Sequence, residues 1–155
     1  VYKRQLQYPV AAEKLGSCLA DKLGISGVGS VLSPAMGGLI IGHELGRALG
    51  CRAVFAERQD GKLTLRRFGL TAGEKVVVAE DVVTTGGSLL ETVDLARNAG
   101  AEVMAVCCLV DRSGDKNPVP GLVSLVKADV VTYEPDSCPL CDKGLELVKP
   151  GSRKV

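Results

Sequence analysis

The sequence predicts an α/β fold with a mostly parallel central sheet flanked by helices. Short apolar runs alternate along the chain with amphipathic stretches that have a helical period. Strands separated by helices pair in parallel through right-handed crossovers, and such sheets are covered on both faces. A chain of 155 residues suits one domain better than two, so we expect residues 1–155 to form a single domain.

Three stretches have the pattern of helices: residues 9–23, 37–49 and 89–98. In the first, Pro9 suits an initial helical position, and leucines recur every four residues. Glycines follow the other two, Gly50 directly and Gly100 one residue later, and glycine is common just beyond a helix end.

Five apolar runs predict strands, at residues 28–32, 53–56, 75–80, 102–110 and 122–126. Asp60 and Gly61 lie between two polar arms, and an Asp-Gly pair is a signal for a tight hairpin turn. Neighbouring side chains of a strand point to opposite faces. We therefore expect the adjacent Cys107 and Cys108 to pack as small apolar side chains on different faces of the sheet.

Composition excludes several classes of function. Nineteen basic and eighteen acidic residues give a net charge of +1, and aromatic residues are only 3%, which argues against a nucleic-acid-binding protein. No apolar run approaches the roughly 20 residues of a membrane span. Six cysteines are too few for a secreted disulfide scaffold, so we expect a cytoplasmic location. The chain starts at Val1 rather than Met, and we expect an incomplete N-terminus.

The strongest motif is VVVAEDVVTTGGS, at residues 76–88. An apolar strand ends in two carboxylates, and a Thr/Gly/Ser loop then leads into a helix. Ligands of open α/β sheets bind beyond the carboxyl ends of strands, and a Gly-rich turn into a helix exposes N–H groups to a phosphate. Carboxylates accept hydrogen bonds from hydroxyls or from hydrated Mg²⁺. The motif therefore predicts a site for a phosphorylated polyol with a metal, the alternative being a tight turn with surface acids.

Two further segments have the composition of anion sites. Residues 33–38 open a helix, and their glycines allow the main chain to approach an anion, although they could equally serve helix–strand packing. Residues 57–67 carry four basic side chains in a short hairpin. These suit a polyanion, or they keep an exposed edge strand soluble. The four are Arg58, Lys62, Arg66 and Arg67.

The run at 76–88 resembles the phosphoribosyl diphosphate (PRPP) signature of the type I phosphoribosyltransferases. The resemblance implies that family's fold, with a protruding catalytic hairpin. It implies that two acids hold the ribose hydroxyls, that a loop holds the 5′-phosphate, and that a second loop holds the pyrophosphate. The implied PRPP contacts are Glu80, Asp81, Val82, Val83, Thr84, Thr85, Gly86, Gly87 and Ser88. The implied pyrophosphate loop is Ser33, Pro34, Ala35, Met36, Gly37 and Gly38, and the implied catalytic residues are Arg58, Lys62 and Asp81.

Smaller features resemble the orotate-specific members of this family over nearly the whole chain from about Leu6. A guanidinium matches the orotate carboxylate in bidentate geometry, and the resemblance implies that Arg112 and Thr84 bind orotate. The implied reaction converts orotate and PRPP to orotidine 5′-monophosphate and pyrophosphate in UMP biosynthesis. The implied cofactor is Mg²⁺, held mainly by PRPP and water rather than directly by the protein. A homodimer is implied, with the hairpin acting on the neighbouring subunit and with no nucleic-acid or membrane partner.

Two alternatives keep the same fold. One is an enzyme that uses a purine or uracil as the base, and the other is a PRPP-sensing regulator without turnover. A purine-specific relative would more often carry an aromatic residue before its base-recognising loop. Tyr133 is the nearest candidate, and we interpret it as an ordinary strand residue. A regulator needs a nucleic-acid-binding surface, for which a net charge of +1 gives no support.

Cys138 and Cys141 form a C-x-x-C pair. Structural zinc usually has four ligands, and the only histidine, His43, is distant in the sequence and expected on a helix surface. We interpret the pair as a packed turn with free thiols. A zinc site that borrows cysteines from elsewhere or from a partner chain remains open. Residues 149–154 are expected to form a solvated end.

Overall fold

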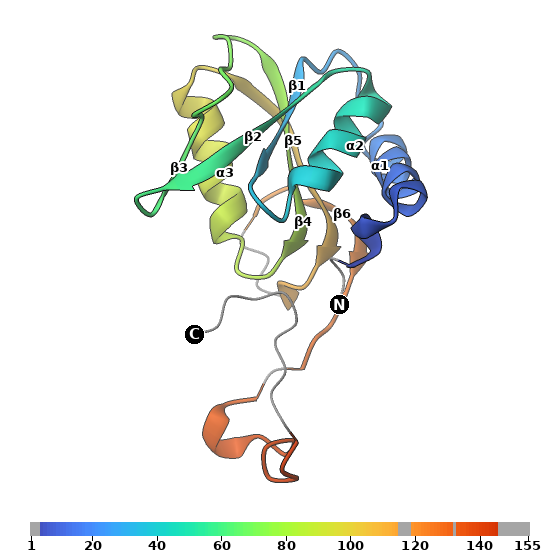
Figure 1. Cartoon of the computed structure of the whole chain (residues 1–155), viewed down its shortest axis with the longest axis vertical. Helices are drawn as coiled ribbons and strands as arrows, with labels where there is room; N and C mark the ends of the chain where they lie inside the picture. The colour runs from blue at the N-terminus through green and yellow to red at the C-terminus, as the bar shows by residue number, and fades with distance from the viewer. Residues whose placement is uncertain (1–3, 115–118, 132, 146–155) are drawn as a thin grey trace.

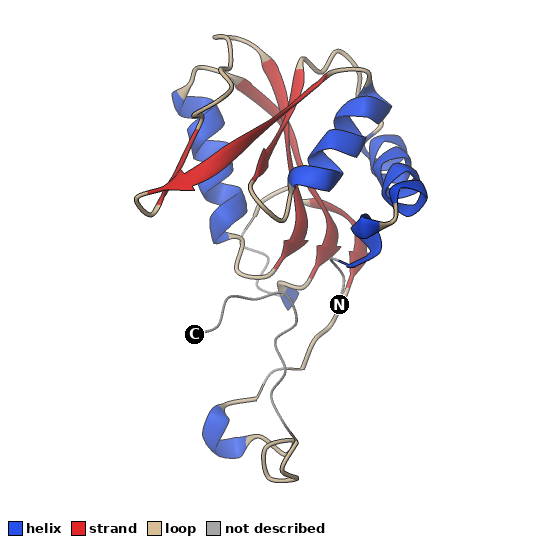
Figure 2. Ribbon diagram, viewed as in Figure 1, coloured by secondary structure: helices blue, strands red, loops and turns tan. Residues whose placement is uncertain are grey.

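One six-stranded sheet organises the residues that the computed structural model describes, 4–114, 119–131 and 133–145 (Figures 1 and 2). The strand order is β3-β2-β1-β4-β5-β6. The strands are β1 (Ser30–Pro34), β2 (Arg52–Gln59), β3 (Lys62–Thr64), β4 (Lys75–Val83), β5 (Glu102–Asp111) and β6 (Val123–Lys127). The helices are α1 (Pro9–Leu23), α2 (Leu39–Leu49) and α3 (Gly87–Asn98), with the short 3₁₀ helices η1 (Arg4–Gln7) and η3 (Pro135–Ser137).

The sheet is parallel except at one edge, where β3 pairs antiparallel to β2. β1 lies at the centre and pairs in parallel with both β2 and β4, and β5 and β6 extend the sheet beyond β4. The chain therefore builds outward from β1 in one direction and from β4 in the other. This reversal of strand order is the place where open α/β sheets bind ligands, beyond the carboxyl ends of the two central strands.

The helices cover the two faces of the sheet separately (Figure 2). On one face, α1 and α2 pack on a core that includes Val77 and Ala79 of β4. On the other face, α3 packs on a core that includes Val76 and Val78. This alternation follows from the two-residue period of a strand. Neighbouring cysteines of β5 divide in the same way, Cys107 into the first core and Cys108 into the second, as the sequence predicts.

Predicted element boundaries were wrong where polar residues belong to a buried element. β4 continues to Val83 rather than ending at residue 80, because it keeps its parallel pairing with β5 through Val82–Val110 and Val83–Asp111. β1 is likewise displaced, to Ser30–Pro34 from the predicted 28–32. Backbone pairing does not depend on side-chain polarity, and both strands are central, so the ladder continues past the apolar run.

Helix boundaries shift in both directions. α1 spans Pro9–Leu23 as predicted, with Pro9 in its first turn and Gly24 in the left-handed conformation (φ 58°) at its end. α2 begins at Leu39 rather than at residue 37, whereas α3 begins at Gly87 rather than at residue 89.

Beyond the sheet, residues 133–145 extend away from the helices (Figure 1). Tyr133 lies outside any strand and is 47% exposed, so the prediction of an ordinary strand tyrosine was wrong. The preceding strand, β6, ends at Lys127, well before this residue. Among the described residues, no helix has both the length and the apolar content needed to cross a membrane.

Candidate functional site

The two loops that the sequence singles out meet beyond the ends of β1 and β4. These strands are direct neighbours, with Ser30 opposite Val76 and Leu32 opposite Val78. A cavity of about 300 Å³ opens where they end. Its lining comes from both loops and consists of Pro34, Ala35, Met36, Gly37, Glu80, Asp81, Val82 and Ser88. The fold therefore brings together segments almost fifty residues apart in the sequence.

A smaller cavity, of about 70 Å³, adjoins the first and shares three of its lining residues. It is lined by Glu80 and residues 82–89. Within it, residues 84–88 form what we call the phosphate cradle. Gly86 has φ 74°, a conformation that favours glycine, and this lets the chain turn directly into α3. The first N–H groups of a helix have no partner within the helix, so the cradle suits an anion.

Glu80 and Asp81 are buried at the floor of this site, 8% and 1% exposed. The Asp81 N–H donates to Oε1 of Glu80 at 3.2 Å, and the Val82 N–H donates to Oδ1 of Asp81 at 2.8 Å. These bonds fix the orientation of each carboxylate relative to the strand. An ionised carboxylate only accepts hydrogen bonds, and its two oxygens accept several, so the pair suits a ligand that presents hydroxyl groups.

The side chains at this site also determine whether a metal ion could bind there. Within residues 4–114, 119–131 and 133–145, no group of three or more His, Cys, Asp or Glu side chains is arranged to hold an ion. Mg²⁺ takes oxygen ligands, keeps several waters and commonly binds through one or two carboxylates together with substrate phosphates. Glu80 and Asp81, beside a phosphate cradle, therefore suit hydroxyl groups or the waters of a hydrated magnesium ion that is held mainly by substrate phosphate.

Ser33 and Gly38, from the predicted pyrophosphate loop, lie elsewhere. Ser33 is 2% exposed and lines a separate cavity of about 330 Å³. That cavity is completed by Leu39, His43, Ala53, Val54, Phe55 and Phe68. Gly38 is buried, and a Cβ there would lie 3.0 Å from the Pro34 carbonyl oxygen and 3.1 Å from that of Ala79. Its small size therefore serves close packing of helix on strand.

The hairpin of β2 and β3 turns at Asp60 (φ 47°) and Gly61 (φ 83°), as the sequence predicts. Arg58 is opposite Leu63 across the hairpin, so both side chains lie on one face. Lys62, adjacent to Leu63, lies on the other face. The two basic residues predicted to be catalytic therefore point in opposite directions, and neither lines the cavities described above.

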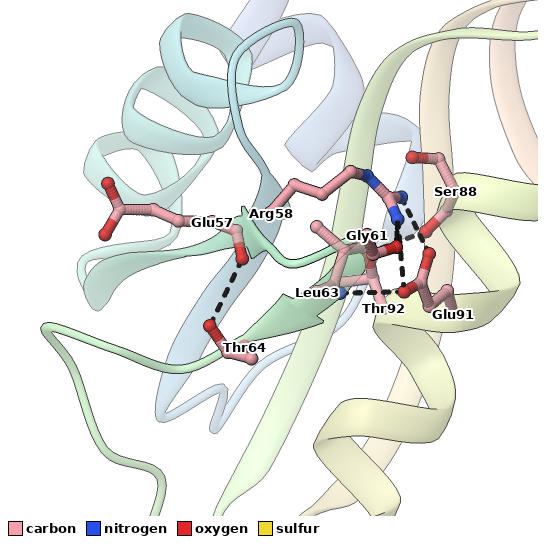
Figure 3. Close-up of polar contacts among 8 residues, drawn as sticks. All are labelled: Glu57, Arg58, Gly61, Leu63, Thr64, Ser88, Glu91 and Thr92. Atoms are coloured by element: carbon pink, nitrogen blue, oxygen red, sulfur yellow. Dashed lines mark hydrogen bonds and ion pairs between the residues drawn. The ribbon is translucent and has the colours of Figure 1, made fainter.

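The Arg58 side chain faces α3 and forms an ion pair with Glu91 there (Figure 3). Its Nη2 lies 2.7 Å from Oε2 of Glu91, and its Nη1 also donates to the Gly61 carbonyl oxygen. Another basic side chain of the segment, Arg67, donates from Nε to Oε2 of Glu57 at 2.9 Å. Acidic partners within the chain thus compensate two of the four positive charges.

Thr84 and Arg112, the predicted orotate contacts, lie side by side at the ends of two adjacent strands. Each directly follows one member of the last β4–β5 pair, Val83 and Asp111. The Arg112 N–H donates to the Val83 carbonyl oxygen at 2.8 Å, which continues the ladder by one bond. Arg112 is half-buried and Thr84 is exposed.

Sequence reasoning missed two acidic residues that support the site. Oδ1 of Asp111 accepts from the Ser113 N–H at 2.9 Å and from its hydroxyl at 2.5 Å, which shapes the turn that holds Arg112. An Asp two residues before a Ser is a recognisable signal for such a turn. Glu91, which binds the hairpin, was also missed. Its only signal is an acid one turn after the Gly-rich motif, in a chain whose hairpin carries four basic side chains.

The cysteine pair forms an exposed turn away from these cavities, in which the Asp142 N–H donates to the Cys138 carbonyl oxygen at 3.1 Å. Hydrogen bonds from the backbone and thiol of Cys141 lower the pKa of Cys138. The same thiol–thiol contact raises the pKa of Cys141. His43 is exposed on α2, as predicted. Residues 149–154 lie outside the described residues.

The chain is similar to known orotate phosphoribosyltransferases. Residues 19–135 match the family model of the phosphoribosyl transferase domain. The orotate phosphoribosyltransferase of Desulforamulus reducens is 49% identical over 152 residues, covering 97% of this chain and 80% of that protein. The orotate phosphoribosyltransferase of Carboxydothermus hydrogenoformans is 50% identical over 151 residues, covering 94% and 78%.

Solved structures resemble the fold at lower identity. Orotate phosphoribosyltransferase from Aeropyrum pernix aligns with a TM-score of 0.68 at 24% identity, over 82% of this chain and 77% of that one. Adenine phosphoribosyltransferase from Thermoanaerobacter pseudethanolicus aligns with a TM-score of 0.67 at 21% identity, over 80% and 84%. Enzymes that act on different bases thus share this fold, so the fold does not identify the base. The relatives that are similar in sequence indicate orotate.

Proposed function

The chain belongs to the phosphoribosyltransferases and, within them, to the orotate phosphoribosyltransferases, and we propose how its residues divide the work of that reaction. The family converts orotate and PRPP to orotidine 5′-monophosphate and pyrophosphate, a step in UMP biosynthesis. We propose that residues 1–155 act as a single domain. The observation that carries the assignment of residues is the cavity in which residues 34–37 meet Glu80, Asp81 and Ser88.

PRPP is proposed to lie across the ends of β1 and β4. The phosphate cradle binds the 5′-phosphate through N–H and hydroxyl donors, and Glu80 and Asp81 accept from the ribose hydroxyls. The loop at residues 34–37 lines the other side of the same cavity and holds the pyrophosphate. With Met36 and Gly37 in this loop, its anion contacts come from the main chain rather than from a basic side chain.

Displacement takes place at the anomeric carbon of the ribose. A ring nitrogen of orotate forms a bond to this carbon as the bond between the carbon and the pyrophosphate oxygen breaks. The electron pair of the broken bond leaves with the pyrophosphate, and the proton of the ring nitrogen is released to the pyrophosphate or to water. The developing sugar cation and the leaving group are stabilised by positioning and by charge. Mg²⁺, when bound beside the diphosphate, neutralises part of its charge. The chain's own residues hold the ribose and orient the two reacting groups.

Arg112 and Thr84 are proposed to bind orotate. A guanidinium donates two parallel hydrogen bonds to a carboxylate, and the orotate carboxylate is the group that distinguishes this base from uracil. Thr84 is the first residue of the phosphate cradle, and Arg112 lies next to it at the end of β5. This adjacency supports the assignment.

The hairpin is proposed to supply Lys62 to the pyrophosphate in the neighbouring subunit of a homodimer, whereas Arg58, predicted from the sequence to be catalytic as well, is paired with Glu91 of its own α3. Lys62 is exposed on the face of the hairpin that points away from its own α3, and this supports action in a second copy. Mixing two inactive variants tests it. In a dimer of Lys62→Ala with Asp81→Asn, one of the two sites has both residues intact. Equal mixing and reassembly should restore about a quarter of the wild-type rate, whereas action within one subunit restores none.

The activity itself is tested by incubating the chain with PRPP, Mg²⁺ and orotate and measuring pyrophosphate release. Orotate-dependent release that falls sharply in Asp81→Asn supports the proposal. Pyrophosphate release with a purine or uracil but not with orotate would leave the fold assignment intact and show that orotate is not the base. PRPP binding without release under any condition would support the regulator alternative instead.

A further inference from the structure

Glu91 contacts both members of one cross-strand pair of the hairpin (Figure 3). Oε1 accepts from the Leu63 N–H at 2.7 Å, and Oε2 accepts from Nη2 of Arg58 at 2.7 Å. A longer contact of 3.4 Å joins Nη1 of Arg58 to Oε1. Because Arg58 and Leu63 are opposite each other in the hairpin, one carboxylate fastens both strands at the same level.

The Leu63 N–H needs this partner. β3 is the edge of the sheet, and the Leu63 N–H donates to Glu91 rather than to another strand. The side chain of Leu63 is buried in the α3-facing core, 6% exposed. Glu91 thus covers the edge strand with a charged acceptor at the point where the hairpin meets the core.

The same helix carries the phosphate cradle. α3 begins at Gly87, Ser88 lines both site cavities, and Glu91 lies one turn later. The Thr92 hydroxyl donates to the Ser88 carbonyl oxygen at 2.7 Å, which adds a bond within this first turn. A single short helical segment therefore connects the cradle at one end to the hairpin on its side.

We propose that Glu91 is a positioning residue that holds the hairpin on α3 through Arg58 and the Leu63 N–H, so that Lys62 on the opposite face keeps a fixed direction. This inference rests on the proposed function, because it gives the hairpin its place in the reaction. Without the contact, the hairpin would keep its turn but lose its fixed orientation. The side chain of Lys62, on the opposite face, would then no longer point in a fixed direction. Glu91 does not itself contact the substrate.

Two substitutions separate the parts of the contact. Glu91→Gln keeps an oxygen for the Leu63 N–H but removes the charge that binds Arg58, whereas Glu91→Ala removes both. Asp94→Asn is the matched control, since Asp94 is an exposed acid of the same helix and the substitution changes the net charge equally. Each variant is compared with the wild type for melting temperature, steady-state kinetics and tryptic cleavage at Lys62.

The expected result is graded. Cleavage at Lys62 rises about fivefold in Glu91→Gln and further in Glu91→Ala, since a partly exposed ion pair contributes up to a factor of about five. The kcat/KM for PRPP falls by a similar factor, while the KM for orotate stays unchanged, a split that a general loss of stability would not produce. Asp94→Asn matches the wild type in every measurement.

A double-mutant cycle with Arg58→Ala tests whether Glu91 acts through Arg58. The two effects on kcat/KM should be less than additive, because the second substitution removes a contact already lost. If the wild type is active but Glu91→Gln behaves like Asp94→Asn, or if the effects are fully additive, the positioning role is wrong. If the wild type forms no nucleotide, the proposed function fails, while the cleavage assay still reports on the hairpin contact.

Discussion

Gly42 of α2 lies directly against Ser33 of β1. A Cβ atom at Gly42 would come 2.5 Å from the Ser33 hydroxyl oxygen and 2.9 Å from its Cβ, closer than real contacts allow. This close approach seats α2 on the central strands. Since residues 35–38 connect β1 to α2, the packing at Gly42 also sets where this connection lies relative to β4.

Gly42→Ala should therefore destabilise the fold and disturb the loop. Overpacking of a well-packed core typically costs about 1–3 kcal/mol, and we expect a fall of that size in the free energy of unfolding in urea. The KM for PRPP should rise at the same time. Gly69→Ala is the control, because a Cβ at Gly69 has nothing within 4 Å. Equal stability of the two variants would show that α2 shifts without consequence.

Asp81→Asn and Lys62→Ala should each lower the rate by about 10²–10³, the loss typical of one preorganised electrostatic contact. The reasons differ, because Asp81 is buried in the cavity and Lys62 is exposed on the hairpin. We expect both variants to remain folded by circular dichroism. Near-wild-type turnover in either variant removes that residue from the mechanism.

The Glu91 carboxyl should titrate below its usual range. The hydrogen bond from the Leu63 N–H is the larger cause of the lowered pKa, and the Arg58 guanidinium also contributes. A carboxyl whose pKa is lowered by folding stabilises the folded state above its unfolded pKa of about 4.3. That contribution is lost as the pH falls through the lowered pKa. In Arg58→Ala, the pKa of Glu91 should rise only part of the way toward its usual value, because the hydrogen bond from the Leu63 N–H remains. Carbon-detected NMR titration measures this pKa, and an unchanged value would contradict the ion pair.

The cysteines should differ strongly in reactivity. Burial raises the pKa of Cys108 to about 12 and raises that of Cys107 as well, whereas the pKa of Cys138 is lowered. Thiolates are the reactive form, so iodoacetamide at pH 8 should label Cys138 well before the two buried thiols. Peptide mapping by mass spectrometry measures the order, with a urea-unfolded sample as the control. Equal labelling in the native protein would show that β5 opens readily.

The sequence predicts most of the strands and helices. The strands contain continuous apolar runs, and in the helices the apolar residues recur with a helical period. The end of β4 escapes prediction, since Glu80 and Asp81 interrupt the apolar run although the parallel pairing with β5 continues to Val83. The position of Ser33 escapes for a similar reason. A serine at a loop boundary looks like a ligand contact, but here its hydroxyl packs against a glycine of the next helix.

The hairpin shows a second limit of sequence reasoning. Its turn and its basic residues can be recognised locally, but the partner of Arg58 lies 33 residues away and belongs to another element. Local patterns also do not reveal that Arg58 and Lys62 lie on opposite faces, because this depends on the register of two strands. Tertiary contacts of this kind assign different roles to side chains that look equivalent in the sequence.

The central claim is that this chain transfers the phosphoribosyl group of PRPP to orotate. The most direct test offers the purified chain PRPP, Mg²⁺ and an equimolar mixture of orotate, uracil, adenine, hypoxanthine, xanthine and guanine, and identifies the nucleotides by mass spectrometry. We expect orotidine 5′-monophosphate as the only nucleotide, and its yield should fall in Arg112→Ala. A purine nucleotide or UMP formed in place of orotidine 5′-monophosphate would contradict the account.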